Sequence, residues 1–222
     1  MIMNKVFTHV QTDIKDDLAS ETSEAGRFYI APSGIRLPSV TTVTGRKKSR
    51  FFAEWRKKNP KESKRVTRRG SRFHSLIEDY INNDFNPEVE TKDQQPDMID
   101  LFVVLKDELD KIDNIRAQEA PLWSERIGLA GRVDCVADYD GVPCIIDFKA
   151  SSRRKREEDI GNYMMQATAY ALMWQIRTGE KINDFAILIA CEDGTSQVFR
   201  GKVLKWVPKL YNEIKDYYSS ME

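Results

Sequence analysis

The chain has 222 residues, of which 41% are hydrophobic, and its 35 basic and 35 acidic residues leave no formal net charge. This length favours one domain with a substantial core, and the composition excludes a chain that is disordered throughout. No apolar run approaches the roughly 20 residues of a membrane span, and Met1 to Asp16 lacks the layout of a secretory signal. We therefore expect a soluble, intracellular protein without a membrane partner.

The charges are distributed unevenly along the chain. Basic residues crowd the stretch from Arg46 to Arg72, whereas Asp13 to Glu24 and Asp79 to Glu119 are acidic. A dense run of cations favours a surface that binds a polyanion, and a solvated helix face is the alternative. The three cysteines lie in apolar, strand-like stretches without CxxC spacing, so we expect free buried thiols.

The N-terminal part is expected to contain an arm, a hairpin and basic helices. Residues 1–25 carry a weak pattern, which fits a short helix or a loosely attached arm, and a single domain would follow from 26 to 222. Arg27 to Ile30 and Ile35 to Thr42 alternate around a Pro-Ser-Gly turn and predict a hairpin. A helix is predicted from about Phe51 to Asn82, with a break at Asn59-Pro60. The hairpin and the basic helices together make up residues 26–90.

The remaining chain predicts a sheet with helices around it. A helix is expected over Pro96–Ala117, followed by a catalytic sheet core over residues 118–222. The fold class is therefore α+β, with a central mixed sheet flanked by helices. The expected elements of the core are strands Leu129–Tyr139 and Val142–Lys149, helix Glu157–Arg177, strands Phe185–Cys191 and Thr195–Gly201, and helix Lys205–Tyr218.

One predicted hairpin brings chemistry together. Asp140-Gly141 between two alternating apolar runs is a strong signal for a two-residue type I′ turn. Counting outward from that turn places Asp134 directly opposite Asp147, where Cβ atoms lie about 4.5–5.5 Å apart and like charges destabilise the pair. Lys149 follows Asp147 by two residues, so its amine points to the same side of the strand.

Two carboxylates and an amine on one face suit hydrolysis of a phosphodiester. Oxygen ligands of this kind favour Mg²⁺ or Mn²⁺, which keep waters and accept phosphate oxygens as further ligands. A bound ion would activate water, and Lys149 would position or deprotonate that water and stabilise the transition state. The alternative is that Asp134 and Asp147 are solvated strand residues, with Lys149 as their ion-pair partner.

These residues resemble the core of the PD-(D/E)XK nuclease superfamily, which has a restriction-endonuclease-like fold, and in particular its RecB-like branch. The resemblance spans about residues 35–175 and departs from the family at Ala150, where relatives often have threonine. The matching segments are, in chain order, Pro38 to Thr42, Gly70 to His74 with Glu78, Glu119, Gly128 to Asp134, Ile145 to Ser151, and Gln166 with Tyr170.

The resemblance implies roles beyond the hairpin. It implies that His74 approaches or ligates the metal, and Glu78, one helical turn further on, shares its face. The expected metal ligands are thus Asp134, Asp147, His74 and Glu78, together with Phe148, and the expected catalytic residues are Asp134, Asp147, Lys149 and Gln166. The expected DNA contacts are Ser39, Thr41, Thr42, Trp55, Arg69, Arg72, Ser151, Arg153 and Tyr170.

The expected function is a Mg²⁺- or Mn²⁺-dependent DNA nuclease. The resemblance adds that it is an exonuclease on single-stranded DNA, in replication, recombination or repair. A non-catalytic nucleic-acid-binding module on the same fold and a DNA endonuclease are the alternatives. We expect a monomer in the cytoplasm of a bacterial or phage-infected cell rather than in a mitochondrion, because no transit peptide is visible.

Overall fold

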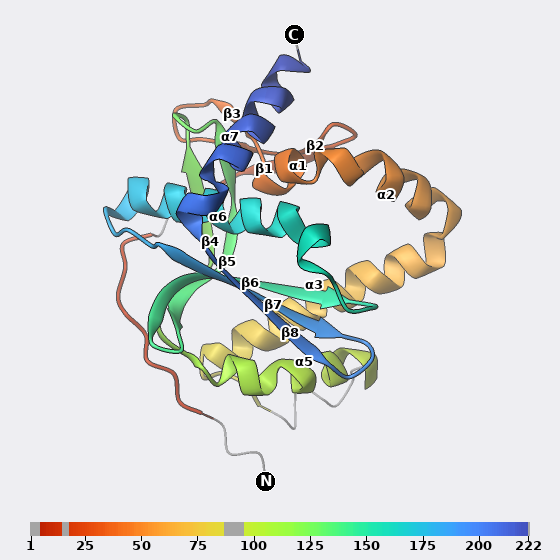
Figure 1. Ribbon diagram of the computed structural model, residues 1–222, viewed down its shortest axis with the longest axis vertical. Coiled ribbons are helices and arrows are strands. Elements are labelled where there is room, and N and C mark those ends of the chain that lie inside the picture. The colour runs from red at the N-terminus through yellow and green to blue at the C-terminus, as the bar shows by residue number, and fades with distance from the viewer. Residues whose placement is uncertain (1–4, 15–17, 87–95, 222) are drawn as a thin grey trace.

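A mixed five-stranded sheet forms the centre of the computed structural model, which describes residues 5–14, 18–86 and 96–221 (Figure 1). The strands follow the order β4-β5-β6-β7-β8; β6 and β7 run parallel, and the other neighbours are antiparallel. This arrangement confirms the expected α+β class with a central mixed sheet. The strands are β4 (Ile112–Ser124), β5 (Leu129–Tyr139), β6 (Val142–Ser151), β7 (Asp184–Cys191) and β8 (Ser196–Lys202).

Helices cover both faces of this sheet (Figure 1). Along β6, Ile145 packs into the core under α1, α6 and α7, whereas Ile146 and Phe148 pack into the core under α3 and α5. This alternation is the period-two pattern of a strand that is buried on both faces. The helices are α1 (Val40–Thr44), α2 (Arg46–Lys58), α3 (Pro60–Ile81), α5 (Pro96–Leu109), η1 (Glu157–Ile160), α6 (Gly161–Thr178) and α7 (Val203–Ser219).

A second, three-stranded sheet lies beside β5. It contains β1 (Ser20–Ser23), β2 (Gly26–Ile30) and β3 (Arg36–Pro38), and β2 and β3 form the predicted hairpin. Part of the expected arm, residues 1–25, lies against the domain, because β1 pairs with β2 and Phe7 is buried.

The prediction that the hairpin strand extends to Thr42 is wrong, because α1 begins at Val40. The cause is a cap: the Ser39 side chain accepts a hydrogen bond from the backbone N–H of Thr42, 3.0 Å away, and so satisfies a free donor of the first turn. The basic helix therefore also begins earlier than expected, at Arg46. Its break at Asn59 is confirmed, since Pro60 starts α3.

The prediction of one helix over Pro96–Ala117 is also wrong. Helix α5 ends at Leu109, and β4 starts at Ile112. The sequence predicts a helix here because the apolar residues from Ile99 through Leu109 to Ile112 recur at roughly helical spacing. In the structure, a register shift in β4 between Asp113 and Ala117 lets Ile112 and Ile115 reach the same core from a strand.

Two smaller expectations concern the hairpin and the cysteines. Asp140 and Gly141 have φ values of 50° and 73°, as a type I′ turn requires, and Tyr139 pairs with Val142 as predicted. All three cysteines are free and buried, which confirms that prediction.

Within the described ranges, no helix has both the length and the apolar character to cross a membrane.

We predict that Gly141→Ala lowers the free energy of unfolding by about 1–2 kcal/mol, because an L-residue is strained at positive φ. Gly70→Ala is the control, since Gly70 lies inside α3 and an added Cβ meets nothing within 4 Å. There alanine should raise stability by about 0.5–1 kcal/mol. Urea denaturation of both variants measures the two effects; equal shifts in the same direction would contradict the turn geometry.

Candidate active site and metal centre

Three carboxylates lie side by side across three neighbouring strands. In the β4–β5 ladder, Gln118 pairs with Cys135 and Ala120 pairs with Val133. These two pairs place Glu119 opposite Asp134. The last pair of the β5–β6 ladder, Cys135 with Ile146, places Asp147 next to Asp134 on the other side. The predicted register is observed from Tyr139 and Val142 as far as Cys135 and Ile146, where the ladder ends, so Asp134 and Asp147 lie just beyond its last pair. Like charges this close need compensation by cations or by hydrogen-bond donors.

Strands β5 and β6 part where these carboxylates lie. Their ladder ends at Cys135 and Ile146, whereas β6 continues to pair with β7 as far as Ser151. Beyond that point, the backbone N–H of Phe148 donates to Asp134 Oδ2 at 2.9 Å instead of to a carbonyl of β5. The Asp134 side chain thus satisfies a donor that the ladder leaves open, and the site forms in the gap between the strands.

Lys149 and Asp147 form a buried ion pair within this gap. Lys149 Nζ lies 2.6 Å from Asp147 Oδ1, and Asp147 is only 2% exposed. Burial raises the pKa of Asp147 to about 6, although the Lys149 ammonium opposes this shift. Burial alone would lower the pKa of Lys149, but the carboxylates of Asp147 and Asp134 outweigh it and raise that pKa above its ordinary value. Lys149 is therefore a cation at neutral pH in this arrangement.

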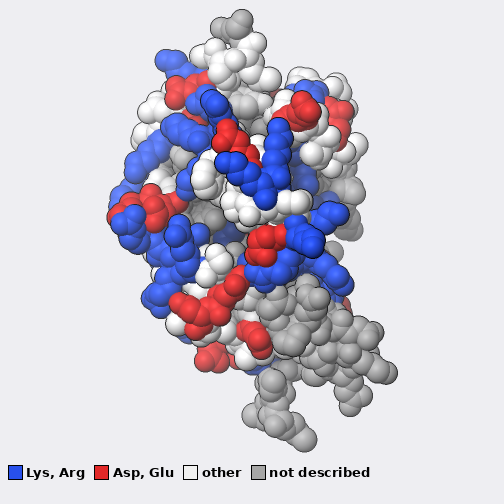
Figure 2. Space-filling model, turned by 90° about the vertical axis from the view of Figure 1, so that its right-hand side faces the viewer, with Lys and Arg blue, Asp and Glu red and all other residues white. Residues whose placement is uncertain are grey.

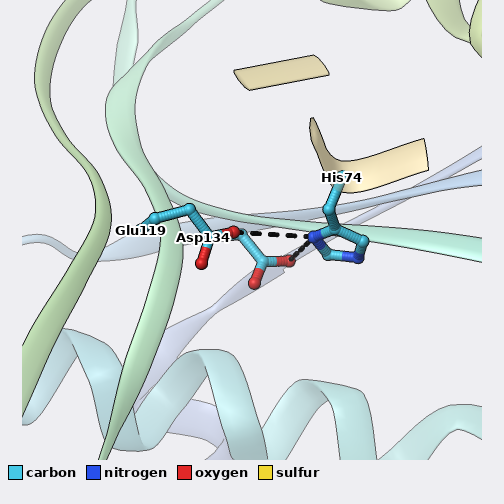
Figure 3. Close-up of side chains that lie close together, drawn as sticks. All are labelled: His74, Glu119 and Asp134. Carbon is cyan, nitrogen blue, oxygen red and sulfur yellow. Dashed lines mark ion pairs between the residues drawn. The ribbon is translucent and has the colours of Figure 1, made fainter. Parts of the chain in front are cut away.

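His74 reaches the carboxylates from α3. Its Nδ1 lies 3.7 Å from Glu119 Oε1 and 3.8 Å from Asp134 Oδ2, as Figure 3 shows. One ligand atom from each of these three residues lies within 4.8 Å of the others. Burial lowers the pKa of His74. The contact with Glu119 and the charge of Asp134 raise this pKa by more than burial lowers it, so the net shift is upward.

The donor set fits a divalent cation. Two ligand atoms that are each about 2.1 Å from one ion lie at most about 4.2 Å apart, and both His74 contacts are within this limit. In addition, Asp147 Oδ2 is buried and has no hydrogen-bond partner among the described residues. An acceptor oxygen left bare in a protein interior is costly, and a cation beside it removes that cost.

The other two expected ligands lie next to this group. Glu78 lies one helical turn after His74, and both residues line one cleft. Burial, and then the charge of Glu119, raises the pKa of the Glu78 carboxyl. Phe148 is a buried core residue that contributes its backbone at the gap, as described above for its N–H. Neither belongs to the triad of His74, Glu119 and Asp134.

A cleft of about 510 Å³ opens onto the triad. Helix α6 lines it with two buried residues, the expected catalytic residue Gln166 and the expected DNA contact Tyr170. Ser39 and Thr41 line the opposite part of the cleft, and Thr41 is the exposed member of the two.

Several residues expected to contact DNA have partners inside the protein. Ser39 caps α1, and Thr42 Oγ1 donates to the backbone carbonyl of Arg27 at 3.2 Å. Ser151 is buried and donates to the carbonyl of Arg153 at 2.6 Å. Arg69 is 2% exposed and forms an ion pair with Glu192 of the β7–β8 turn.

These contacts indicate structural roles for Ser39, Ser151 and Arg69, and the burial of Arg69 keeps its guanidinium from the surface where DNA would bind. The remaining expected contacts are more accessible. Arg153 is exposed, while Trp55 on α2 and Arg72 on α3 are half-buried.

Glu119 is the residue of the triad that the predicted site omits. It matches a family segment, but the sequence places it in the connection between a presumed helix and the first strand. The register shift in β4 and the positive φ of 42° at Glu119 are what bring its carboxylate opposite Asp134. A carboxylate one strand away from a predicted acid is the signal that would have identified it, once β4 is recognised as a strand.

A sequence profile of the PD-(D/E)XK nuclease superfamily matches residues 48–203, which is more than half of the chain. The chain therefore belongs to the PD-(D/E)XK nuclease superfamily, and the resemblance seen in its motifs is confirmed. Nucleases of this superfamily use divalent metals, which agrees with the donor set described above.

Two curated relatives share the name Mitochondrial genome maintenance exonuclease 1. The protein from Homo sapiens is 28% identical over 138 residues, and that from Mus musculus is 26% identical over 132 residues. Each match covers 54% of this chain and 38% of the relative, so the chain spans about two fifths of the length of these relatives. A crystal structure from Eubacterium rectale, provisionally named an exonuclease, is similar with a TM-score of 0.47 and 17% identity over 70% of this chain and 65% of that one.

We predict that Gly131→Ala disturbs the site through Tyr170. An added Cβ would lie 2.7 Å from the Tyr170 hydroxyl and 3.0 Å from a ring carbon, and this ring is buried. Such overpacking should lower stability by about 1–3 kcal/mol. Tyr170→Phe removes the nearest atom, so Gly131→Ala should cost less in that background. Thermal denaturation of the two single variants and the double variant measures this coupling, and additive effects would contradict the contact.

Proposed function

We propose that this protein is a nuclease that hydrolyses DNA phosphodiester bonds with Mg²⁺ or Mn²⁺, and that it acts as an exonuclease on single-stranded DNA. The observation that supports this most is the grouping of three carboxylates and one ammonium at the point where β5 and β6 part. Asp147 Oδ2, buried in the same gap, has no hydrogen-bond partner in the described part of the chain, which makes a purely structural ion pair a poor explanation.

The metal would be held by Asp134, Asp147 and Glu119, with His74 as a nitrogen donor and Glu78 as a neighbouring carboxylate. These are mostly hard oxygen donors, which suit Mg²⁺ and Mn²⁺, and the imidazole favours Mn²⁺ of the two. A divalent ion bound there supplies Lewis-acid polarisation of the phosphate and a lower pKa for water. The backbone of Phe148 fixes Asp134 in place for this task.

Lys149 and Gln166 would act on the substrate directly. The Lys149 ammonium, held at 2.6 Å by Asp147, stabilises the negative charge that develops on the phosphoryl oxygens. Gln166 is buried on α6 and lines the cleft, so its amide is positioned to orient the attacking water or a phosphate oxygen. Tyr170 keeps its proton at neutral pH, because burial and then the charges of Asp134 and Asp147 raise its pKa.

Support for DNA as the substrate comes from the surface and from the relatives. Figure 2 shows Lys and Arg side chains gathered, with acidic ones between them, on the side of the molecule that carries α2 and the start of α3. Thr41, Arg72, Trp55 and Arg153 would contribute to binding on and beside this face. The relatives are named exonucleases of genome maintenance, and we propose a related role in DNA replication, recombination or repair, carried out by a monomer.

We predict that the protein degrades linear single-stranded DNA with Mg²⁺ or Mn²⁺ and that EDTA abolishes this activity. Asp147→Asn and Lys149→Ala should each lower the rate about 100-fold to 1000-fold, because the first weakens the hold on the metal and the second removes the cation beside the reacting phosphate. Matched controls are Asp107→Asn and Lys205→Ala, which make the same changes at exposed residues of α5 and α7 and should leave the rate unchanged. Release of labelled nucleotides on a denaturing gel measures the rates.

The form of the substrate separates the alternatives. A circular single strand should resist an exonuclease, and its cleavage would indicate an endonuclease. Tight binding of DNA by the unaltered protein without any cleavage would contradict the nuclease proposal and favour a non-catalytic binding module.

A further inference from the structure

A second cleft, of about 620 Å³, lies between α2 and the segment that joins β6 to α6. Aromatic rings and cations predominate in its lining: α2 contributes two phenylalanines and two lysines, and the segment after β6 contributes a run of four basic residues. The aromatic and cationic residues that matter for binding are Phe51, Phe52, Arg153, Arg154, Lys155 and Tyr163.

The two phenylalanines of α2 carry rings that the core does not use. Phe51 and Phe52 are 66% and 46% exposed, and their rings meet edge to face with centroids 5.5 Å apart. Helix α2 has no buried residue. Polar contacts attach it to the domain instead: Lys47 pairs with the buried Glu213 at 2.6 Å, and Lys48 donates to the carbonyl of Asp159 at 2.6 Å. Adjacent exposed rings that do not hold their own helix in place point to a ligand.

The run of basic residues after β6 is held rigidly. Lys155 donates its backbone N–H to Gln197 Oε1 at 2.7 Å, and the Gln197 amide donates to the Lys155 carbonyl at 2.9 Å. The segment is therefore clamped to β8. Burial, followed by the charges of Arg153 and Lys48, lowers the pKa of Lys155, which reflects a crowding of positive charge. Arg156 is different, because it pairs with Glu158 and Asp159.

The second cleft adjoins the catalytic amine. Tyr163 lines this cleft, and its ring centroid lies 5.2 Å from Lys149 Nζ. Gln166 and Tyr170 follow Tyr163 at helical spacing on α6 and line the first cleft. One face of α6 thus leads from the first cleft, past Lys149, to the second cleft.

We propose that the second cleft is a binding subsite for an unpaired nucleic acid strand, in which bases stack on Phe51 and Phe52 while phosphates contact Arg153, Arg154 and Lys155. This inference rests on the proposed nuclease function and names where the strand continues on one side of the scissile phosphate. Charge complementarity selects a polyanion, and the rings select one with exposed base faces, because paired bases cannot lie flat on a side chain. The subsite therefore favours a single strand over a duplex.

The test is binding of oligodeoxythymidylate that carries 2-aminopurine near one end, in EDTA so that no cleavage occurs. Stacking on a phenylalanine ring quenches the 2-aminopurine fluorescence, which a purely structural effect would not do. Phe51→Ala combined with Phe52→Ala should weaken binding of long strands about tenfold or more and abolish the quenching. Phe51→Tyr keeps the ring and should keep both signals. Tyr211→Ala removes another exposed ring, 66% exposed on α7, and should change neither.

Two further comparisons sharpen the result. Strands too short to pass Lys149 should bind the double alanine variant as well as they bind the unaltered protein. Poly-glutamate should compete weakly, since it offers charge without base faces; equal competition would overturn the stacking role. Moving the 2-aminopurine to the other end of the strand tells which end occupies this cleft.

The outcomes separate this inference from the proposed function. If the unaltered protein cleaves single-stranded DNA but the double alanine variant binds it with unchanged affinity and quenching, the subsite is overturned and the nuclease stands. If the unaltered protein neither binds nor cleaves single-stranded DNA, the proposed function fails and the subsite fails with it.

Discussion

The structure is organised around a repulsion between three carboxylates at adjacent positions of β4, β5 and β6. Facing side chains on neighbouring strands have Cβ atoms about 4.5–5.5 Å apart; Glu119 faces Asp134, and Asp147 lies just beyond the last β5–β6 pair, so the three charges oppose folding unless they are compensated. Lys149 compensates one of them, and the imidazole of His74 lies beside the other two. Among the residues that the structure describes, no donor reaches a buried oxygen of Asp147, and a divalent cation would compensate its charge.

The surrounding fold keeps that costly arrangement in place. Strand β6 is anchored by its parallel pairing with β7 through the whole region, so β5 can leave it without disrupting the sheet. Glycine at 131 lets the Tyr170 ring lie against β5, and this ring and Gln166 close the site from α6. Helix α3 brings His74 from the other layer because Phe73 and Ile77 are buried in the core beside it. The site thus lies between the two helical layers, at the opening between two strands.

Local signals in the sequence were sufficient for the hairpin but not for its neighbour. The Asp140-Gly141 turn determines the register of β5 and β6, and the period of two then places Asp134, Asp147 and Lys149 without further information. Glu119 could not be placed in this way, because the helical spacing of the apolar residues up to Ile112 extends the predicted helix into β4, and the register shift between Asp113 and Ala117 interrupts the alternation of that strand. Likewise, the alternation of residues 35–42 predicts a strand at Ser39, since its capping bond to Thr42 exists only once α1 forms. Long-range pairing and capping determined these segments, and neither leaves a clear periodic pattern.

The most direct test of this account is the melting temperature of the protein and of Asp134→Asn, with and without Mn²⁺. Without metal, the variant should melt higher than the unaltered protein, because it relieves the repulsion while the amide oxygen still accepts from Phe148. At free Mn²⁺ about 100-fold above its dissociation constant, the melting temperature of the unaltered protein should rise by about 5–10 °C and that of the variant by much less. A variant that melts lower without metal, or an equal response of both proteins to Mn²⁺, would contradict the account.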